Sequence, residues 1–209
     1  VVRLSIPAFG EKIAFHTAFV IFAAYVGHLG TLEMSANQAL IAIESLGFMV
    51  AHGFSVAAAA LVAQKLGADM PREAVAVGWI TAGLGAIVLG SIGLIFWFFP
   101  EPLIRCFSDN PDIIAMGVPC LRIAAVVQPL MAICEAMAGG LRGAGDTRTP
   151  MIAALVGPVT VRLFFCWFLA FEVGLGLYGI WIGTSLDWVV RVVFLTTAFK
   201  KENWLRIRI

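Results

Sequence analysis

Charge is scarce in this sequence. Only 13% of its 209 residues are Asp, Glu, Lys or Arg, and 61% are hydrophobic. A soluble domain is usually about half apolar, and about a quarter of its residues are charged. The net charge of +1 provides no basic surface for nucleic acid, so we expect no nucleic-acid partner. Apolar runs of about 20 residues or more instead predict an integral membrane protein.

Enzyme motifs are missing as well. The sequence has no HExxH pattern and no phosphate-binding loop, so nothing in it indicates metalloprotease chemistry or an ATP-driven reaction. Gly143-Ala144-Gly145-Asp146 matches the GxGD pattern of aspartyl intramembrane proteases, but Asp146 lies in a predicted turn rather than inside the bilayer. Gly53-Phe54-Ser55-Val56 resembles the nucleophile segment of rhomboid proteases, yet no His follows residue 52. We therefore expect a protein that is not an enzyme.

Cysteine and cofactor patterns are also few. The four cysteines form no CxxC pair, and three of them lie in apolar runs, where a Cys usually acts as a small hydrophobe. We therefore expect no cofactor and no resident metal. The sequence opens at Val1-Val2-Arg3, without an initiator Met or a signal peptide, so we expect a piece of a longer protein.

Six apolar runs are each long enough to cross about 30 Å of hydrocarbon as a helix. Charged or Gly-rich turns separate them, and residues 141–150 form the clearest of these turns. There Gly143 and Gly145 let the chain turn, Thr149 is expected to cap the next helix, and Pro150 suits its first turn. Residues 1–209 are therefore predicted to form a single all-α membrane domain, a bundle of six transmembrane helices at residues 6–26, 34–62, 74–99, 112–138, 151–171 and 177–199.

Prolines lie inside two of these runs. Pro119 and Pro129 fall within the fourth run and Pro158 within the fifth. A proline in a helix has no N–H, so the carbonyl four residues earlier loses its partner. In a membrane that carbonyl must face protein rather than lipid, and we expect kinks at Pro119 and Pro129.

Lys and Arg are distributed unevenly over the connections between the runs. The first-second, third-fourth and fifth-sixth connections hold only Arg105. The other connections and the two ends hold nine such residues, namely Arg3, Lys65, Arg72, Arg142, Arg148, Lys200, Lys201, Arg206 and Arg208. By the positive-inside rule, both termini and the 141–150 turn are predicted to be cytoplasmic.

Polar residues form a stripe on the second run. Asn37, Glu44, His52 and Ser55 fall within an arc of about 80° when each residue turns the helix by 100°. One interpretation is a seam of hydrogen bonds between helices. The other is the lining of a cavity that meets a substrate or a coupling ion. The residue pattern leaves both open.

Other charged residues also lie within the predicted spans. Glu11 follows Pro7 by one turn, and it is either a cation- or proton-binding carboxylate or an interfacial Glu paired with Lys12. Asp187 and Arg191 are spaced i, i+4 on the sixth run, which favours a local ion pair. Arg162 lies at a similar depth on the fifth run, so it is a second candidate partner for Asp187, and we expect this group to be structural.

Several segments resemble one family of transporters. They are Ile6-Pro7 with Glu11, Val26-Gly27-His28-Leu29-Gly30-Thr31, Gln64-Lys65-Leu66-Gly67-Ala68, the 141–150 turn, and Gly174-Leu175-Gly176-Leu177-Tyr178-Gly179-Ile180-Trp181-Ile182-Gly183. In this order they are similar to a lobe of the multidrug and toxic compound extrusion (MATE) transporters. The resemblance extends over essentially the whole chain.

The resemblance implies a fold and a function. The family has twelve helices in two six-helix lobes around a central cleft, and this chain resembles the C-terminal lobe. It implies export of small amphipathic or cationic compounds in exchange for sodium ions or protons, with a second lobe from the same chain or a homodimer partner. It also implies a place in a lipid bilayer, here the bacterial plasma (inner) membrane. In family members with a glutamate like Glu11, that residue faces the central cavity and takes part in cation coupling. Other members carry an aspartate on the fourth helix, but the corresponding segment here, Val127-Gln128-Pro129-Leu130-Met131, has no acid.

Two rival functions remain open from the sequence. A flippase for lipid-linked saccharides on a related fold would need a cationic cavity, with Arg122 and Arg162 facing it. A membrane assembly subunit without transport would have a polar stripe fully satisfied by neighbouring helices and no cleft.

Overall fold

A computed structural model describes the backbone of residues 2–206 and the side chains of Ile13 and of residues 16–205. Every regular element within this part of the chain is helical. Five helical segments are long and apolar enough to cross a membrane, and the described part of the first helix adds a shorter apolar stretch, His16–Leu29. The predicted all-α membrane fold is confirmed.

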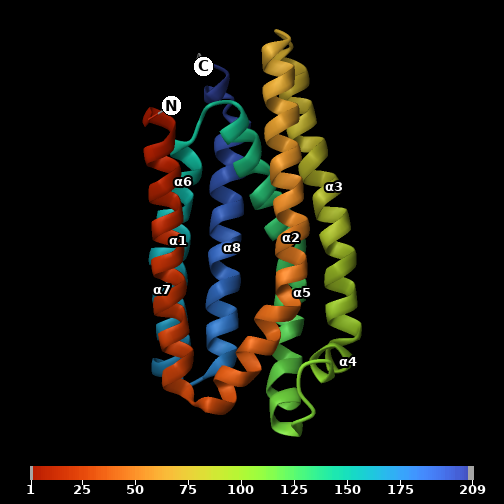
Figure 1. Ribbon diagram of the computed structural model, residues 1–209, viewed down its shortest axis with the longest axis vertical. Helices are drawn as coiled ribbons and strands as arrows, with labels where there is room; N and C mark the ends of the chain where they lie inside the picture. The colour runs from red at the N-terminus through yellow and green to blue at the C-terminus, as the bar shows by residue number, and fades with distance from the viewer. Residues whose placement is uncertain (1, 207–209) are drawn as a thin grey trace.

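Six long helical segments run up and down the bundle (Figure 1). They are α1 (Val2–Leu29), α2 (Thr31–Gly67), α3 (Pro71–Phe98), α5 (Pro111–Gly143), a fifth segment made of α6 (Arg148–Ala154), η1 (Leu155–Arg162), α7 (Leu163–Trp167) and η2 (Phe168–Glu172), and α8 (Leu177–Lys200). The short helices α4 (Pro100–Arg105) and η3 (Asn203–Arg206) lie in the third connection and after α8. The start of α1, the end of η3 and the α5–α6 turn lie at the same end of the bundle (Figure 1). The side of the membrane that this end faces stays a prediction.

The α5–α6 turn is capped differently from the sequence expectation. Asp146 Oδ1 accepts a hydrogen bond from the backbone N–H of Thr149 at 3.0 Å, and Asp146 Oδ2 accepts one from the Thr149 hydroxyl at 2.6 Å. The acceptor at the start of α6 is therefore the Asp146 carboxylate, whereas Thr149 is the donor. A carboxylate is also favoured here by the positive end of the helix dipole.

The interior prolines are accommodated in two ways. α5 continues through Pro129, and the carbonyl of Ala125, which Pro129 leaves without an intrahelical partner, lies against Gly93 of α3. A Cβ at Gly93 would lie 2.5 Å from that oxygen, so only glycine lets the freed carbonyl face protein, as expected. In the fifth segment, the chain around Pro158 widens into the π-helical turns of η1. These turns differ from the regular helix that we predicted, and π turns are often found at functional sites.

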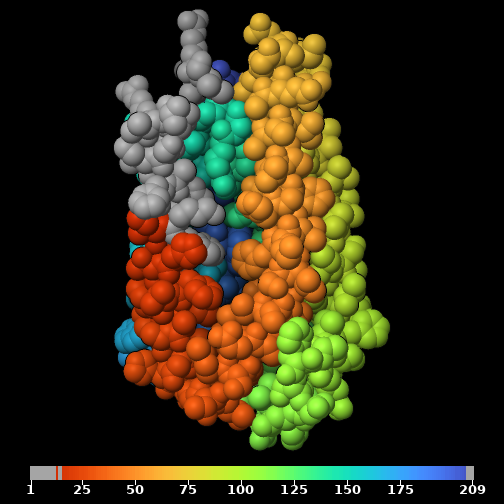
Figure 2. All heavy atoms as spheres, in the orientation of Figure 1, coloured from red at the N-terminus to blue at the C-terminus, as the bar shows by residue number. Residues whose placement is uncertain are grey.

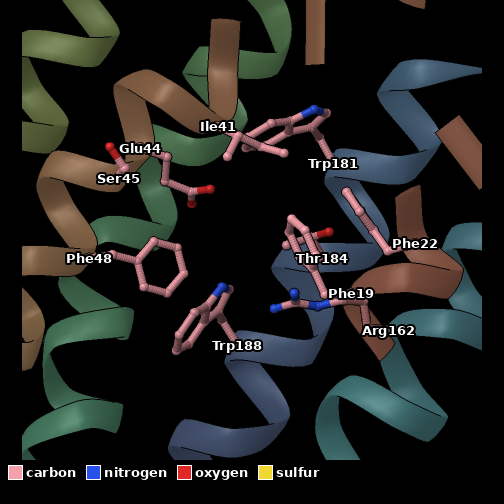
Figure 3. A pocket seen from close by; sticks show the side chains of 10 residues that line it. All are labelled: Phe19, Phe22, Ile41, Glu44, Ser45, Phe48, Arg162, Trp181, Thr184 and Trp188. Atoms are coloured by element: carbon pink, nitrogen blue, oxygen red, sulfur yellow. The ribbon is translucent and has the colours of Figure 1, made fainter. Parts of the chain in front are cut away.

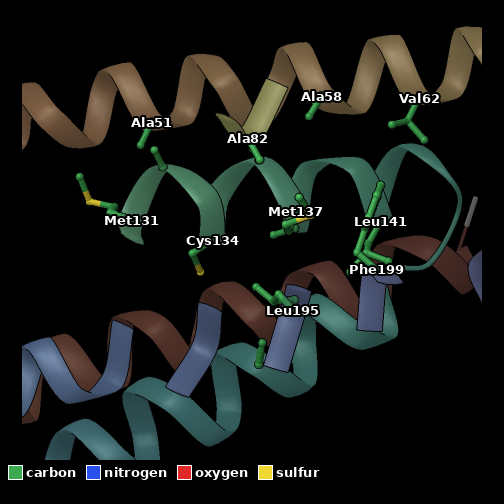
Figure 4. Packing of buried hydrophobic residues seen from close by; sticks show 14 of the residues in the cluster. Ala51, Ala58, Val62, Ala82, Met131, Cys134, Met137, Leu141, Leu195 and Phe199 are labelled. Carbon is green, nitrogen blue, oxygen red and sulfur yellow. The ribbon is translucent and has the colours of Figure 1, made fainter. Parts of the chain in front are cut away.

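Small residues bring α2 and α5 into close contact. A Cβ at Gly139 would collide with the backbone of Ser55, and one at Gly143 would collide with the backbone of Ala59. Around this contact lies a buried cluster from α2, α3, α5 and α8, including Val62, Met137, Leu141, Leu195 and Phe199 (Figure 4). Close packing of this kind holds helices together in lipid, where apolar surface alone provides little drive. α2 and α5 therefore form one wall of the bundle.

Candidate functional site

A cavity of about 260 Å³ lies between α1, α2, α8 and the end of η1. The space-filling view shows a hollow between α1 and α2, with α8 visible behind it (Figure 2). Half of the cavity's lining residues are aromatic, and the whole set is Phe19, Phe22, Ile41, Glu44, Ser45, Phe48, Arg162, Trp181, Thr184 and Trp188 (Figure 3). Pockets that enclose a drug-sized ligand have about 300–1,000 Å³. This cavity is thus near the lower limit for such a ligand.

Glu44 of α2 is the acidic group of the cavity. The residue is only 7% exposed, and its carboxylate points into the cavity (Figure 3). Among the residues that the structure describes, none donates a hydrogen bond to this carboxylate and no cationic nitrogen lies within 4 Å of it. A buried carboxylate without a partner is costly inside a membrane protein. Glu44 is therefore open to a ligand that brings a positive charge.

Arg162, Asp187 and Arg191 form a buried ion cluster beside this carboxylate. Arg162 Nε donates to Asp187 Oδ2 at 2.9 Å, and Arg162 Nη2 lies 2.7 Å from the same oxygen. Arg191 Nε donates to Asp187 Oδ1 at 2.9 Å and Nη2 donates to Oδ2 at 3.1 Å. The Arg191 guanidinium also stacks on the Trp188 ring, 3.7 Å from its centroid. Asp187 therefore binds both arginines that the sequence analysis named as its candidate partners.

The local sequence explains how this ion cluster is built. Asp187 and Arg191 are one turn apart on α8, so they lie on the same face of that helix. Arg162 ends the π-helical η1, which faces α8. Gly157 of η1 lies directly against the cluster, and a Cβ there would collide with Asp187 and with the side chain of Arg191. A glycine in a widened helix thus makes room for three buried charged side chains.

The charges of the site are unevenly compensated. The ion cluster has one carboxylate and two guanidinium groups, so it carries a net positive charge, and Glu44 balances it at a distance. Arg162 lines the same cavity as Glu44, but two of its nitrogens already lie against Asp187. Among the described residues of the site, two carboxylates thus stand beside two guanidinium groups, and Glu44 is the carboxylate without a direct counter-charge.

The remaining predicted site residues do not line this cavity. Asn37 is buried and its Oδ1 has no hydrogen-bond partner, while Ser55 is buried against α5. His52 is exposed, which differs from the predicted polar stripe pointing into the bundle. The 18 residues from Asn37 to Ser55 extend over about 27 Å of helix, which is longer than one cavity. The side chain of Glu11 lies outside the described residues.

Other residues of the site were missed from the sequence. Trp181, Thr184 and Trp188 line the cavity from one face of α8, and their i, i+3, i+7 spacing is a signal that could have indicated them. Gln128 of α5 is wholly buried, and neither of its amide atoms has a partner among the described residues. No group of three or more His, Cys, Asp or Glu residues within the described part of the chain could hold a metal ion.

Comparison with known proteins identifies relatives over nearly the whole chain. The family model described as MatE matches residues 7–168. A protein called "Probable multidrug resistance protein NorM" from Thermotoga maritima is 33% identical over 207 residues, which cover 98% of this chain and 44% of that protein. The protein of the same description from Brucella suis is 32% identical and covers 96% and 44%, respectively. The chain thus spans less than half the length of the curated relatives that it matches.

Solved structures share the fold. One described as "Outward-facing conformation of a multidrug resistance MATE family transporter of the MOP superfamily" matches with a TM-score of 0.91 and 20% identity, over 100% of this chain and 46% of that chain. Another, described as "Reverse polarity of binding pocket suggests different function of a MOP superfamily transporter from Pyrococcus furiosus", matches with a TM-score of 0.89 and 21% identity, over 97% of this chain and 45% of that one. The six-helix bundle therefore has the architecture of about half of each of these chains.

Proposed function

Because the chain belongs to the MatE family and has the fold of one lobe, we propose that it is the C-terminal half of a secondary transporter that exports amphipathic organic cations. Two of its relatives are described as probable multidrug resistance proteins, which supports this proposal. The second lobe would come from the rest of a longer chain or from a second copy. The transporter would lie in the bacterial plasma (inner) membrane and exchange its substrate for sodium ions or protons, without a cofactor.

The unpartnered Glu44 carboxylate in an aromatic cavity is the observation on which this proposal rests. A carboxylate attracts an ammonium or iminium group, and aromatic faces add cation–π attraction of about 0.5–2 kcal/mol each, depending on desolvation. Phe48, Trp181 and Trp188 provide such faces around Glu44 (Figure 3). An organic cation with apolar groups would thus provide the counter-charge that Glu44 lacks, whereas a neutral sugar would not.

Exchange would follow from competition for the acidic groups. Glu44 and, by the family resemblance, Glu11 would bind either the coupling ion or the organic cation, so release of one would accompany binding of the other. Alternating access would come from rocking of this lobe against its partner. The cavity in this lobe is small for a whole drug-sized molecule, which supports a binding site completed by the second lobe.

Efflux of a fluorescent organic cation from vesicles tests the proposal. The complete protein would be reconstituted, and dye export would be followed with an imposed sodium or proton gradient. We expect gradient-dependent export in the wild type and loss of at least about tenfold in Glu44→Gln, since one charged contact is worth about 1.5–3 kcal/mol. Glu11→Gln is expected to abolish coupling. The exposed Glu172→Gln is the matched control, because it makes the same change outside the cavity.

The possible results separate the hypotheses. If Glu44→Gln exports dye as well as Glu172→Gln does, transport stands and the role of Glu44 is refuted. If folded and inserted wild-type protein exports no cation under either gradient, the export proposal fails.

The rival flippase has one observation in its favour, since Arg162 does line the cavity. Two of its nitrogens are bound to Asp187, however, and Arg122 is exposed outside the lining. A purely structural subunit is less well supported, because the Glu44 carboxylate is unsatisfied and a cavity exists. Vesicles that contain a lipid-linked saccharide, assayed for its transfer between leaflets, would test the flippase directly.

A further inference from the structure

A second hollow lies on the far side of α8 from the cavity. It is a groove of about 650 Å³ between the C-terminal half of α8, the α5–α6 turn and the start of η3. We call it the C-terminal groove. Its floor is the outer face of α8, with Val189, Val190, Val193 and Phe194, and its rim at the helix end includes Lys201. The groove shares no lining residue with the Glu44 cavity.

α8 has two faces of different chemistry. Asp187, Trp188 and Arg191 are buried in the bundle, whereas the side chains of the groove floor are turned outward, and Val193 is 60% exposed. Exposed Val and Phe on a membrane-spanning helix are in contact with hydrocarbon rather than water. The floor of the C-terminal groove is therefore a surface for an apolar chain.

The groove is about as long as one leaflet of the hydrocarbon core is thick. From Lys201 to Val189 there are 12 residues, or about 18 Å along a helix. Half of the hydrocarbon core is about 15 Å thick. A chain that begins at the level of Lys201 and follows the floor would thus end near the middle of the bilayer, as a single acyl chain does.

The rim has the chemistry of a phosphate and ester site. Lys201 is exposed and has no ion pair with any described residue. Both oxygens of Asp146, the acidic residue of the rim, already accept hydrogen bonds from Thr149. Lys201 is the basic residue of the lining and Asp146 the acidic one, so Lys201 is the charged group of the groove that is left for an anion.

The turn after α8 keeps this rim in place. Glu202 has a positive φ of 54°, which folds η3 back over the helix end. Trp204 is buried there, its Nε1 donates to the Phe199 carbonyl at 2.9 Å, and its ring stacks on Phe199. Asn203 of the same turn lines the rim and provides an amide for ester or phosphate oxygens.

We propose that the C-terminal groove binds one glycerophospholipid with an anionic headgroup. One acyl chain lies along Val189, Val193 and Phe194, and the phosphate lies beside Lys201. Polarity changes along the groove in the order that such a lipid requires, from the apolar floor to the rim with Lys201 and Asn203. A second copy of the chain would match the floor but gives no role to the exposed Lys201.

Native mass spectrometry of the complete, delipidated protein tests this proposal with dioleoyl phosphatidylglycerol and dioleoyl phosphatidylcholine. We expect phosphatidylglycerol to be retained more strongly, and Lys201→Glu to lower its retention at least about fivefold, the weight of one basic charge beside an anionic lipid surface. Lys200→Glu is the matched control, because Lys200 does not line the groove. Val193→Trp fills the floor and is expected to lower retention of both lipids, whereas Val126→Trp changes an equally exposed valine of α5 and should not.

Five results would overturn the proposal. The first four are equal retention of both lipids, equal losses in Lys200→Glu and Lys201→Glu, undiminished lipid binding in Val193→Trp, and a dimer that Val193→Trp dissociates. Inorganic phosphate, the probe for a simple anion site, provides the fifth. If it displaces phosphatidylglycerol at a similar concentration, the acyl chain contributes nothing and the lipid assignment is wrong. All four variants replace exposed side chains, and the thermal unfolding temperature checks that each is folded.

Discussion

Asp187 holds two buried arginines, and its removal is the sharpest test of the ion cluster. Asp187→Asn keeps the shape of the side chain but removes the only carboxylate in contact with Arg162 and Arg191 among the described residues. Asp187 is 0% exposed, so water does not reach this position to compensate the charges of the two arginines. Removing one partner of a buried pair costs about 3–5 kcal/mol, because the remaining charges are left uncompensated.

The expected change in thermal unfolding can be worked from this figure. A change of 1 kcal/mol shifts the unfolding temperature of a protein of 150–250 residues by about 2–4 °C, and by about half as much in one twice as long, so we expect Asp187→Asn to lower it by about 3–10 °C in the complete protein. The assay is the unfolding temperature of the complete protein in detergent, followed by tryptophan fluorescence. Glu101→Gln is the control, since it breaks an exposed i, i+4 pair with Arg105 that is worth about 0–1 kcal/mol.

A compensating variant separates charge from packing. Replacement of Arg162 and Arg191 by Met in the Asp187→Asn background removes the uncompensated charges, and we expect it to restore much of the lost stability. If Asp187→Asn lowers the unfolding temperature no more than Glu101→Gln does, the cluster is not a buried electrostatic unit and the reasoning is refuted.

Three further variants test the packing around the site. Gly157→Ala is expected to lower the unfolding temperature because its Cβ collides with the ion cluster, whereas Gly53→Ala, with nothing within 4 Å of its Cβ, should be neutral or stabilising by about 0.5–1 kcal/mol. Gln128→Met removes two buried, unpartnered amide atoms at similar volume, so we expect equal or higher thermal stability; a loss above about 2 kcal/mol would mean that the amide has a partner. A thiol-reactive maleimide should label only Cys106 in the folded protein, and labelling of the other three cysteines before unfolding would contradict their burial.

The helices could be predicted from the sequence because a helix needs a long apolar run to cross a bilayer. α2 shows the limit of this signal: we predicted residues 34–62, and the helix extends over Thr31–Gly67. Its ends include Glu33, Gln64 and Lys65, which do not look like residues of a span but are compatible with a helix that protrudes from hydrocarbon. The π turns of η1 were not predicted, because Pro158 indicates that a helix loses a hydrogen bond there but not that its turns widen.

The ion cluster of the site could also be predicted in part from the sequence. The i, i+4 spacing indicated the pair of Asp187 with Arg191, and equal depth indicated Arg162. The spacing of Trp181, Thr184 and Trp188 places them on one face of their helix, but it does not say whether that face meets lipid or protein, because aromatic residues in a span can face either. Trp79 and Trp97 are 40% and 45% exposed, whereas Trp188 is 1% exposed, and nothing in their sequence neighbours separates them.

The sequence by itself determined that this protein is a bundle of membrane helices, since only helices that satisfy their own backbone can cross hydrocarbon in such runs. It also determined which residues share a face of one helix, because the helical period is a local property. Only the tertiary structure decided which faces meet. Glu44, Arg162 and Trp188 come from three segments, and their meeting depends on how closely and at what rotation the helices pack. Gly157 lets η1 approach α8 through contacts with Asp187 and Arg191, which are far away in the chain, so no local pattern could show it.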